Sequence, residues 1–235
     1  MKLSNNILTK EKVFEANQKL HKLNLVIDSF GNVSGRDKNS ILIKPSGVNI
    51  DQLTMSKIVT VNLIDGKYVG KFKPSSDTPT HLELYREFQS IGGIVHTHSL
   101  YATAWAQSRK PIPCLGTTHA DYWNGEIPVS RNLTNEEING KYEKETGKVI
   151  IETINKLNVD PLDCPGIMVA NHGSFTWGKT VKDAVKHAEL LEYIARLAWL
   201  TISITSQAKP ISRTLLNKHF SRKHGPNAYY GQDAD

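Results

Sequence analysis

Two parts of the chain have the form of paired short strands joined by tight turns, and this pattern restricts the fold more than any other feature. The stretch GNVSGRDKNSILIKPSG, residues 31–47, has two strand-like runs around a polar turn and ends at Pro45 and Gly47. The stretch GIMVANHGSFTWG, residues 166–178, also predicts a strand pair. Strands joined by a hairpin must run antiparallel, because a parallel pair needs a long crossover connection. The sequence therefore predicts a largely antiparallel sheet.

Helices are predicted around this sheet, but they do not alternate regularly with its strands. Helical segments are expected at 9–23, 78–89, 100–107, 134–157 and 180–205, and a further strand at 57–63. Thr134 and Glu137 form a capping-box pattern, and Gly140 is expected to interrupt the helix that follows. The fold class is therefore mixed α/β. The length of 235 residues suits one large domain or two small ones, and no linker divides the chain.

Composition excludes several classes of protein. Hydrophobic residues make up 39% of the chain and charged residues 22%, which is ordinary for a globular protein. No apolar run is long enough to span a membrane. Cys114 and Cys164 lie far apart without a C-x-x-C partner, which favours a reducing compartment. The N-terminus lacks the apolar core of a signal peptide, so we expect a cytoplasmic protein.

The formal net charge of +6 leaves two kinds of anionic partner to consider. The stretch NKHFSRKHGPNAYYGQ, residues 217–232, combines basic and aromatic residues in the manner of a nucleic-acid-binding arm. Basic residues elsewhere are scattered, and no zinc-finger, RNP or helix-turn-helix pattern occurs. We therefore expect a small anionic ligand, and neither a nucleic-acid nor a membrane partner.

Three histidines follow apolar runs that are predicted to be strands. His96 and His98, in GGIVHTHS, are two residues apart and therefore share one face of a strand. His172 follows the short apolar run 167–169. Three neutral imidazoles with an open fourth position are typical of a catalytic zinc site, although manganese, cobalt or iron also accept nitrogen ligands. The alternative is a hydrogen-bonded pair at a strand end and a separate core or surface histidine.

Three short segments rich in glycine and serine are candidates for an anion site. They are GNVSG at 31–35, KPSG at 44–47 and KPSSD at 73–77. Backbone N–H groups, hydroxyls and a nearby lysine suit a phosphate, and Lys44 and Lys73 stand beside two of the segments. Each segment is also compatible with a plain turn. Neither of the common nucleotide-binding glycine motifs occurs, which argues against a nucleotide-binding fold.

Two further residues are candidates for proton transfer. Asp121, in GTTHADYWNG, stands between small and aromatic residues, a setting that can perturb the pKa of a carboxyl group. Tyr230 lies near the C-terminus. The alternatives are that Asp121 is a turn residue and that Tyr230 is a surface aromatic.

The order of these motifs resembles the class II aldolase/epimerase superfamily of divalent-metal sugar-phosphate enzymes. The segments that carry the resemblance are GNVSG, KPSG, KPSSDTPTH, GGIVHTHS, GTTHADY, HGSFTWG and NKHFSRKHGPNAYYGQ, and they span about residues 11–232. The resemblance implies one α/β/α domain over 1–235 around a mainly antiparallel central sheet, with the C-terminal segment 209–235 contributing to the active site. It also implies a homotetramer with active sites at subunit interfaces.

The resemblance assigns roles to individual residues. The positions that match the metal site, with zinc as the implied ion and manganese or cobalt as replacements, are Asp77, His96, His98 and His172. Asp121 and Tyr230 match a proton donor/acceptor pair on opposite sides of the substrate, with Tyr230 reaching the site from a neighbouring subunit. The positions that match substrate contacts, the first six around its phosphate, are Gly31, Asn32, Ser46, Gly47, Ser75, Ser76, Thr117, Glu143 and His219.

The chemistry that the resemblance implies is epimerisation of a phosphorylated pentulose at C4. The C4 proton is not acidic, so inversion would require cleavage and re-formation of the C3–C4 bond. L-arabinose, L-ascorbate or another sugar could supply the substrate. One alternative is a sugar-phosphate aldolase of the same superfamily, which releases the fragments and carries Glu where Asp77 stands here. Another is a metal-dependent sensor or structural protein that has kept the fold.

Overall fold

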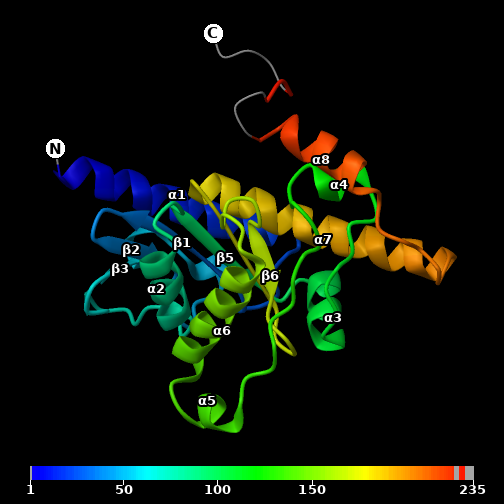
Figure 1. Cartoon of the computed structure of the whole chain (residues 1–235). Coiled ribbons are helices and arrows are strands. Elements are labelled where there is room, and N and C mark those ends of the chain that lie inside the picture. Colours follow the sequence, from blue (N-terminus) through cyan, green and yellow to red (C-terminus); the bar gives the residue numbers. More distant parts are fainter. Residues whose placement is uncertain (1, 225–227, 231–235) are drawn as a thin grey trace.

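One antiparallel sheet with helices on both faces forms the body of the protein (Figure 1), and the computed structural model describes residues 2–224 and 228–230. The strands are β1 (Asn32–Asp37), β2 (Ser40–Ile43), β3 (Val59–Asn62), β4 (Tyr68–Val69), β5 (Gly93–Thr97), β6 (Gly166–Met168) and β7 (Ser174–Gly178). The α-helices are α1 (Lys2–Lys22), α2 (Thr78–Glu87), α3 (Leu100–Ser108), α4 (Thr117–Ala120), α5 (Asn135–Asn139), α6 (Tyr142–Leu157), α7 (Val181–Ile204) and α8 (Arg213–Ser221). Two 3₁₀ helices, η1 (Ile50–Gln52) and η2 (Met55–Lys57), precede β3.

The sheet has the strand order β4-β3-β2-β1-β5-β7-β6, and every ladder in it is antiparallel. A tight turn joins β1 to β2, and Lys38 in that turn adopts a φ of 54°. In the ladder between β1 and β5, Asn32 is paired with His96. These ladders confirm the predicted fold class, and the register brings the segment that starts at Gly31 to the strand that carries the histidine pair.

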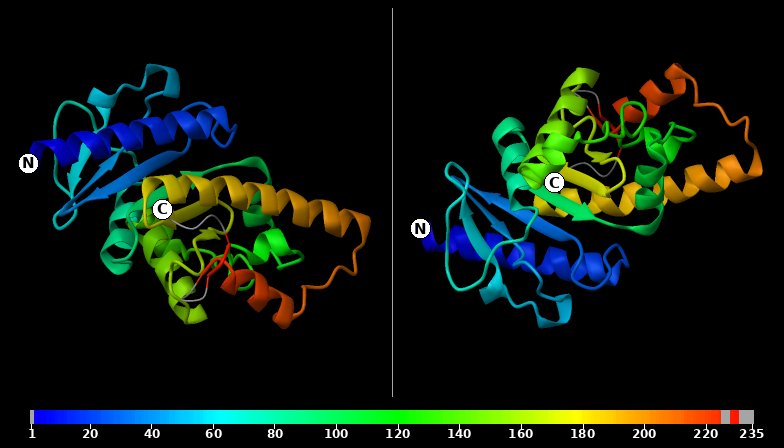
Figure 2. Two further views of the ribbon diagram at one scale, coloured as in Figure 1. Left: turned by 90° about the horizontal axis from the view of Figure 1, so that it is seen from above. Right: turned by 90° about the horizontal axis from the view of Figure 1, so that it is seen from below.

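Two hydrophobic layers hold the helices to the sheet. On one face, α1 and the first half of α7 cover Val33, Leu42 and Val95. Figure 2 shows these two helices side by side in the view from above. On the other face, α2 packs against α6, and both belong to the core that contains Ile41 and Ile94. The alternation of side chains along each strand therefore supplies both cores from a single sheet.

The interruption predicted near Gly140 is confirmed. Helix α5 ends at Asn139 and α6 begins at Tyr142, so the expected helix over 134–157 is two helices with Gly140 and Lys141 between them. The predicted capping box is also present, because the Glu137 N–H donates to Thr134 Oγ1 at 3.3 Å and the Thr134 N–H donates to Glu137 Oε2 at 2.8 Å. This break sets the position at which α6 starts, beside the histidine cluster described below.

Other boundaries differ from the predicted ones. Helix α1 begins at Lys2 rather than at residue 9, and the strand expected from residue 57 begins at Val59, because Lys57 lies in η2. The prediction missed β4, α4 and α8. Helix α8 has few apolar positions among basic and polar ones, so its sequence lacks a clear helical pattern. Of the segment 209–235, residues 225–227 and 231–235 lie outside the described residues. None of the described helices is both long and apolar enough to cross a membrane.

Candidate functional site

Three histidine rings converge at the carboxyl end of β5. His96 lies in β5, His98 directly follows it, and His172 comes from the turn between β6 and β7. One ring nitrogen from each can be chosen so that all three lie within 4.8 Å of one another. The Nε2 atoms of His96 and His98 are 3.1 Å apart, so at least one of them carries a lone pair rather than a proton. Antiparallel pairing of β5 with β7 therefore assembles a group of nitrogen ligands from two distant parts of the sequence.

Neighbouring groups fix the orientation of these rings. Nδ1 of His96 lies 2.9 Å from the Ser174 carbonyl oxygen, to which it donates, and this leaves Nε2 as the acceptor. The same ring stacks on Phe175 with centroids 4.2 Å apart. Asn171 has a φ of 61°, and the turn that it forms presents His172 toward the other two rings. The rings are therefore positioned by the fold before any ion binds.

The surroundings of two of the imidazoles hold them neutral. The His98 ring is exposed at the cavity, yet partial desolvation and the neighbouring His96 lower its pKa to about 4. The pKa of His172 is lowered to about 3 by burial and by both other histidines. Nδ1 of His172 is buried and has no hydrogen-bond partner among the described residues. Neutral imidazoles with converging nitrogens are suited to a divalent cation, and zinc accepts such a set with a fourth position left open.

Gly173 allows the turn that carries His172 to approach β5 closely. A Cβ atom at this position would lie 2.5 Å from the Thr97 carbonyl oxygen. Gly173→Ala is therefore expected to push the His172 turn away from β5, to weaken metal binding, and to cost about 1–3 kcal/mol of unfolding free energy through overpacking. Thermal unfolding and metal titration would measure the two effects.

The matched control for this substitution is Gly116→Ala, because a Cβ atom at Gly116 would have no neighbour within 4 Å. The control variant is expected to match the wild-type protein in both measurements. Equal metal affinity in the Gly173→Ala variant and the control would contradict the role given to the close approach.

A cavity of about 420 Å³ opens beside the histidines and joins most of the predicted site. Its lining includes His96, His98, His172 and the predicted residues Gly31, Asn32, Lys44, Ser46, Gly47, Ser75, Ser76, Asp77 and Glu143. Ser29, Phe30, Pro45 and Tyr142 also line it and were not predicted. Tyr142 stands directly before Glu143 at the first turn of α6, so the predicted helix break was the available signal for it.

The segments KPSG and KPSSD lie side by side in this cavity. An isolated antiparallel bridge pairs Pro45 with Pro74. The Ser46 N–H donates to the Lys73 carbonyl at 3.0 Å, and the Ser75 N–H donates to the Lys44 carbonyl at 2.9 Å. Two segments that looked like separate turns in the sequence therefore form one wall of the cavity.

Lys44 is a buried cation in this wall. Only 4% of the residue is exposed, and its Nζ donates to the Ser29 carbonyl at 3.1 Å. It forms no ion pair with any described residue, and its pKa is lowered by burial despite opposing effects of Asp77 and Asp28. A buried ammonium group without a directly paired carboxylate is costly, so the arrangement favours an anionic ligand in the cavity.

Asp77 stands at the start of α2, between the histidines and the serine-rich wall. Its Oδ2 accepts a hydrogen bond of 2.7 Å from Asn32 Nδ2, which also contacts Ser75 Oγ at 3.2 Å. Burial alone would raise the pKa of Asp77, but His96, His81 and the Asn32 hydrogen bond lower it overall. The carboxylate is therefore ionised at neutral pH and contributes negative charge beside the histidine cluster.

A buried hydrogen-bond chain beneath the cavity was not predicted. Tyr85 Oη lies 3.0 Å from Ser34 Oγ, which lies 2.7 Å from His81 Nδ1. Burial lowers the pKa of His81 to about 3, so its ring is neutral. His81 appears in the motif KPSSDTPTH, but the sequence does not reveal that its partner is two residues after Asn32 on β1.

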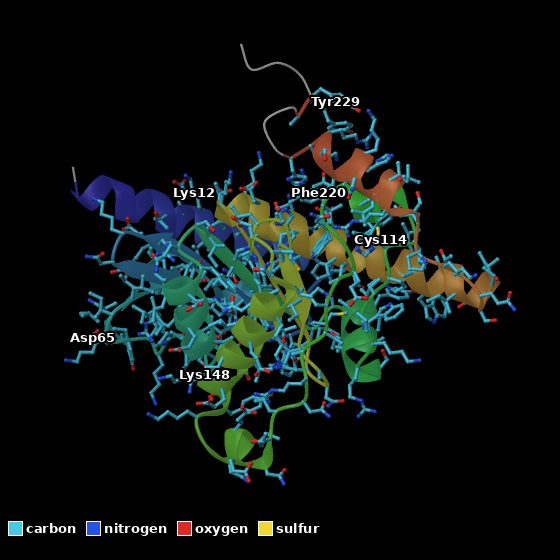
Figure 3. The ribbon with its side chains drawn as sticks, in the orientation of Figure 1. Lys12, Asp65, Cys114, Lys148, Phe220 and Tyr229 are labelled. Carbon is cyan, nitrogen blue, oxygen red and sulfur yellow. The ribbon has the colours of Figure 1, made fainter. Side chains whose placement is uncertain are left out.

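Four predicted site residues do not line the histidine cavity. Thr117 begins α4, Asp121 follows it, and His219 lies in α8. His219 Nδ1 lies 3.0 Å from Asp121 Oδ1, and the Tyr230 N–H donates to the Arg222 carbonyl at 3.0 Å. Figure 3 labels Tyr229 and Phe220 at this C-terminal corner of the molecule, beyond α4. The structure therefore brings Asp121, His219 and Tyr230 of one chain close together, but away from the cavity of that chain.

Asp121 is a strongly paired carboxylate. Arg222 binds both of its oxygens, with Nε 3.0 Å from Oδ1 and Nη2 2.7 Å from Oδ2. Lys223 Nζ lies 3.3 Å from Oδ2. Burial alone would raise the pKa of Asp121, but the bonds from Arg222 and His219 and the charge of Lys223 lower it overall. The sequence indicated a perturbed carboxyl group, and the structure gives the direction of the change and its cause.

The chain belongs to the family described as Class II Aldolase and Adducin N-terminal domain, whose sequence model matches residues 11–199. Solved structures share the fold. An L-fuculose 1-phosphate aldolase is 23% identical over 91% of this chain and 95% of its own, with a TM-score of 0.76. The L-fuculose 1-phosphate aldolase from Glaciozyma antarctica PI12 is 18% identical over 97% and 86%, with a TM-score of 0.77. YgbL from Klebsiella pneumoniae is 22% identical over 90% and 97%, with a TM-score of 0.71.

Proposed function

We propose that this chain is an L-ribulose-5-phosphate 4-epimerase, which interconverts L-ribulose 5-phosphate and D-xylulose 5-phosphate. The reaction is expected to depend on a divalent metal ion, and zinc is the expected ion. The observation that supports the proposal is the set of residues that line one cavity. The histidine cluster lies at one part of it, and Lys44, a buried cation that forms no ion pair with a described residue, lies in its wall. A phosphorylated ketose has matching groups, because it carries oxygens that bind a metal at C2 and C3 and a dianionic phosphate at C5.

Inversion at C4 requires a carbon–carbon bond to break, because the C4 proton is not adjacent to the carbonyl. A divalent ion held by His96, His98 and His172, with Asp77 beside it, would act as a Lewis acid that stabilises the negative charge developing on the oxygens at C2 and C3. When the C4 hydroxyl loses its proton, the electrons of the C3–C4 bond would pass to the three-carbon fragment with C1, C2 and C3, and the fragment with C4 and C5 would become glycolaldehyde phosphate. Re-addition to the opposite face of its aldehyde gives the other epimer.

Lys44 and the serine-rich wall would hold the phosphate during this exchange. Asn32, Ser75 and Ser76 add donors beside the Lys44 ammonium group. A fragment anchored by its phosphate can rotate about its own bonds without leaving, so that re-addition is effectively intramolecular. This anchoring distinguishes an epimerase from an enzyme that releases both fragments.

Asp121 and Tyr230 would exchange protons with the C4 hydroxyl. One group takes the proton during cleavage, and the other returns a proton when the bond forms again. Because neither residue lines the cavity of its own chain, a second copy would have to bring them to it. We therefore propose a homotetramer in which the C-terminal corner of each subunit, with Thr117 and His219, completes the cavity of a neighbour. Glu143 lines the cavity of its own chain.

The second candidate is a class II sugar-phosphate aldolase such as L-fuculose-1-phosphate aldolase. The similar folds of such aldolases favour it, and the same cavity suits its substrate. The residue at position 77 favours the epimerase, because the superfamily resemblance places Glu there in aldolases and this chain has Asp. A sensor or structural role is a third alternative, and turnover of either substrate would exclude it.

A comparison of two assays tests the proposal. The purified protein, loaded with zinc, is expected to convert L-ribulose 5-phosphate to D-xylulose 5-phosphate and to release almost no glycolaldehyde phosphate. Cleavage of L-fuculose 1-phosphate is expected to be slower by at least tenfold in kcat/KM. Faster cleavage of L-fuculose 1-phosphate, or no turnover of L-ribulose 5-phosphate, would overturn the assignment.

Replacing Lys44 with methionine is expected to weaken substrate binding. The variant loses the buried charge that faces the phosphate, so KM for L-ribulose 5-phosphate should rise by about 10–100-fold, as expected for a lost hydrogen bond to a charged group. Release of glycolaldehyde phosphate should also increase. The matched control is Lys73→Met, because Lys73 opens the twin segment KPSSD but is exposed and does not line the cavity. Similar KM values in the two variants would contradict the role of Lys44.

A further inference from the structure

Lys223 connects three side chains at the C-terminal corner. It follows α8, and its side chain is only 14% exposed. Its Nζ donates to Tyr122 Oη at 3.2 Å and lies 3.3 Å from Asp121 Oδ2. The same ammonium group lies 4.2 Å from the centre of the Tyr230 ring and 4.4 Å from that of Tyr122. One cation therefore joins the segment after α4 to the segment that carries Tyr230.

Arg222 differs from Lys223 because it also holds the backbone of Tyr229 and Tyr230. Its guanidinium group binds both oxygens of Asp121 and lies 4.8 Å from the centre of the Tyr230 ring. Its carbonyl accepts the N–H groups of Tyr229 and Tyr230, both at 3.0 Å. Arg222 thus contacts the same ring and the same carboxylate as Lys223 and also anchors the backbone of the tyrosine segment, whereas Lys223 also contacts Tyr122.

The Tyr230 ring is held by contacts with cations and not by burial. Tyr230 is 60% exposed, so its ring is held by cations and backbone hydrogen bonds rather than by burial. A lysine ammonium over an aromatic face is attracted to the negative charge of the ring. Without Lys223, the ring would retain Arg222 as a partner, but the direct connection to Tyr122 and one of the two cations would be gone.

We propose that Lys223 is a positioning residue for the epimerisation, which fixes the phenol of Tyr230 relative to the carboxylate of Asp121 so that both reach a neighbour's cavity in one defined arrangement. The proposal rests on the proposed function, because it assumes that Asp121 and Tyr230 exchange protons with the substrate. It assigns no contact between Lys223 and the substrate.

The charge of Lys223 should also be visible in the dependence of activity on pH. A nearby ammonium group favours the ionised form of a carboxyl group, so its removal raises the pKa of Asp121 and moves the acidic limb of the kcat/KM profile to higher pH. The other titratable or charged groups in contact with Asp121 or its neighbour Tyr122 are Lys186, His187, His219, Arg222 and His224. Further groups of this kind that line the same cavity as Tyr122 are Asp160, Asp163, Lys179, Asp183 and Tyr230. These groups are unchanged in a Lys223 variant, so the shift reports the loss of one charge.

The test compares Lys223→Met with Lys223→Arg and with the control Lys186→Met. Lys186 lies over the Tyr122 ring at 4.9 Å but makes no described contact with Asp121 or Tyr230. It therefore shares with Lys223 only the contact with the Tyr122 ring, and the proposal assigns no effect to that contact alone. Lys223→Met is expected to lower kcat at least tenfold, with KM and metal content unchanged, and to shift the acidic limb upward. Lys223→Arg should recover part of the loss, because arginine keeps the charge and the stacking contact.

Hydrogen exchange provides a measurement that does not depend on activity. In the Lys223→Met variant, the amides of Tyr229 and Tyr230 should exchange faster, while those within α8 keep their wild-type rates. A Lys223→Met variant with the kcat, pH profile and exchange rates of Lys186→Met would overturn the proposal, and so would a loss of thermal stability without a shift of the acidic limb. Wild-type protein without epimerase activity would instead overturn the proposed function, and the exchange rates would still test whether Lys223 holds Tyr230.

Discussion

Asparagine in place of His96, His98 or His172 is expected to remove bound metal and to lower kcat by roughly a thousandfold or more, because the ion supplies several kcal/mol of transition-state stabilisation. Each ring contributes a nitrogen to one group, and the pKa values of His98 and His172 are lowered so that both rings are neutral, so the loss of one ring leaves the ion with only two histidine ligands. Elemental analysis of the purified variants measures the metal, and circular dichroism verifies the fold.

The control for this prediction is His187→Asn. His187 is partly buried, and its Nδ1 donates to the Trp177 carbonyl at 2.7 Å, but it belongs to a different cavity. This variant is expected to keep its metal. Full metal occupancy in any of the three cluster variants, with wild-type activity, would remove that residue from the ligand set.

Mixing two inactive variants is expected to restore activity in one combination and not in another. If the C-terminal corner of one subunit completes the cavity of the next, a His172→Asn subunit still offers an intact Asp121 and Tyr230, and a Tyr230→Phe subunit still offers an intact cavity. Random exchange should then regenerate roughly a quarter of the sites in a ring of heterologous interfaces. Activity after denaturant-free subunit exchange measures the recovery, and native mass spectrometry verifies that hybrids form.

The combination of Asp121→Asn with Tyr230→Phe should recover nothing under the same conditions. Both residues belong to one cluster of one chain, joined through Arg222 and Lys223, so each hybrid interface lacks one of the two groups. Recovery in this combination would mean that Asp121 and Tyr230 act from different subunits. Confirmed exchange without recovery in the first combination would mean that the cavity is completed within a single chain.

The parts of the site that local sequence could predict are those set by local geometry. His96 and His98 share a strand face because of the two-residue period of a strand, and the turn at Gly173 follows from residues next to it. The break between α5 and α6 could likewise be read from Thr134, Glu137 and Gly140.

Contacts between distant segments could not be predicted in this way. The bridge between Pro45 and Pro74 converts two plain turns into one wall, and no residue in either turn indicates the pairing. The bonds from Arg222 to Asp121 join residues 101 positions apart, and they depend on how α8 packs beside α4. Helix α8 has too few apolar positions to be recognised as a helix from its sequence. Arg222, the partner of Asp121, therefore could not be identified in a stretch that resembled a basic arm.

The pairing of Asn32 with His96 in the sheet has a consequence for the spacing of the two groups of residues proposed to bind the phosphate and the metal. Asn32 is one of the residues proposed to contact the phosphate, and His96 is one of those proposed to bind the metal, and the two are directly paired in the ladder between β1 and β5. Adjacent strands are held about 4.8 Å apart by backbone hydrogen bonds, whatever side chains they carry. The backbone of the sheet therefore sets the separation of these two residues. Substitutions in the wall can change how tightly a sugar phosphate binds, but they leave the backbones of Asn32 and His96 at the same distance from each other.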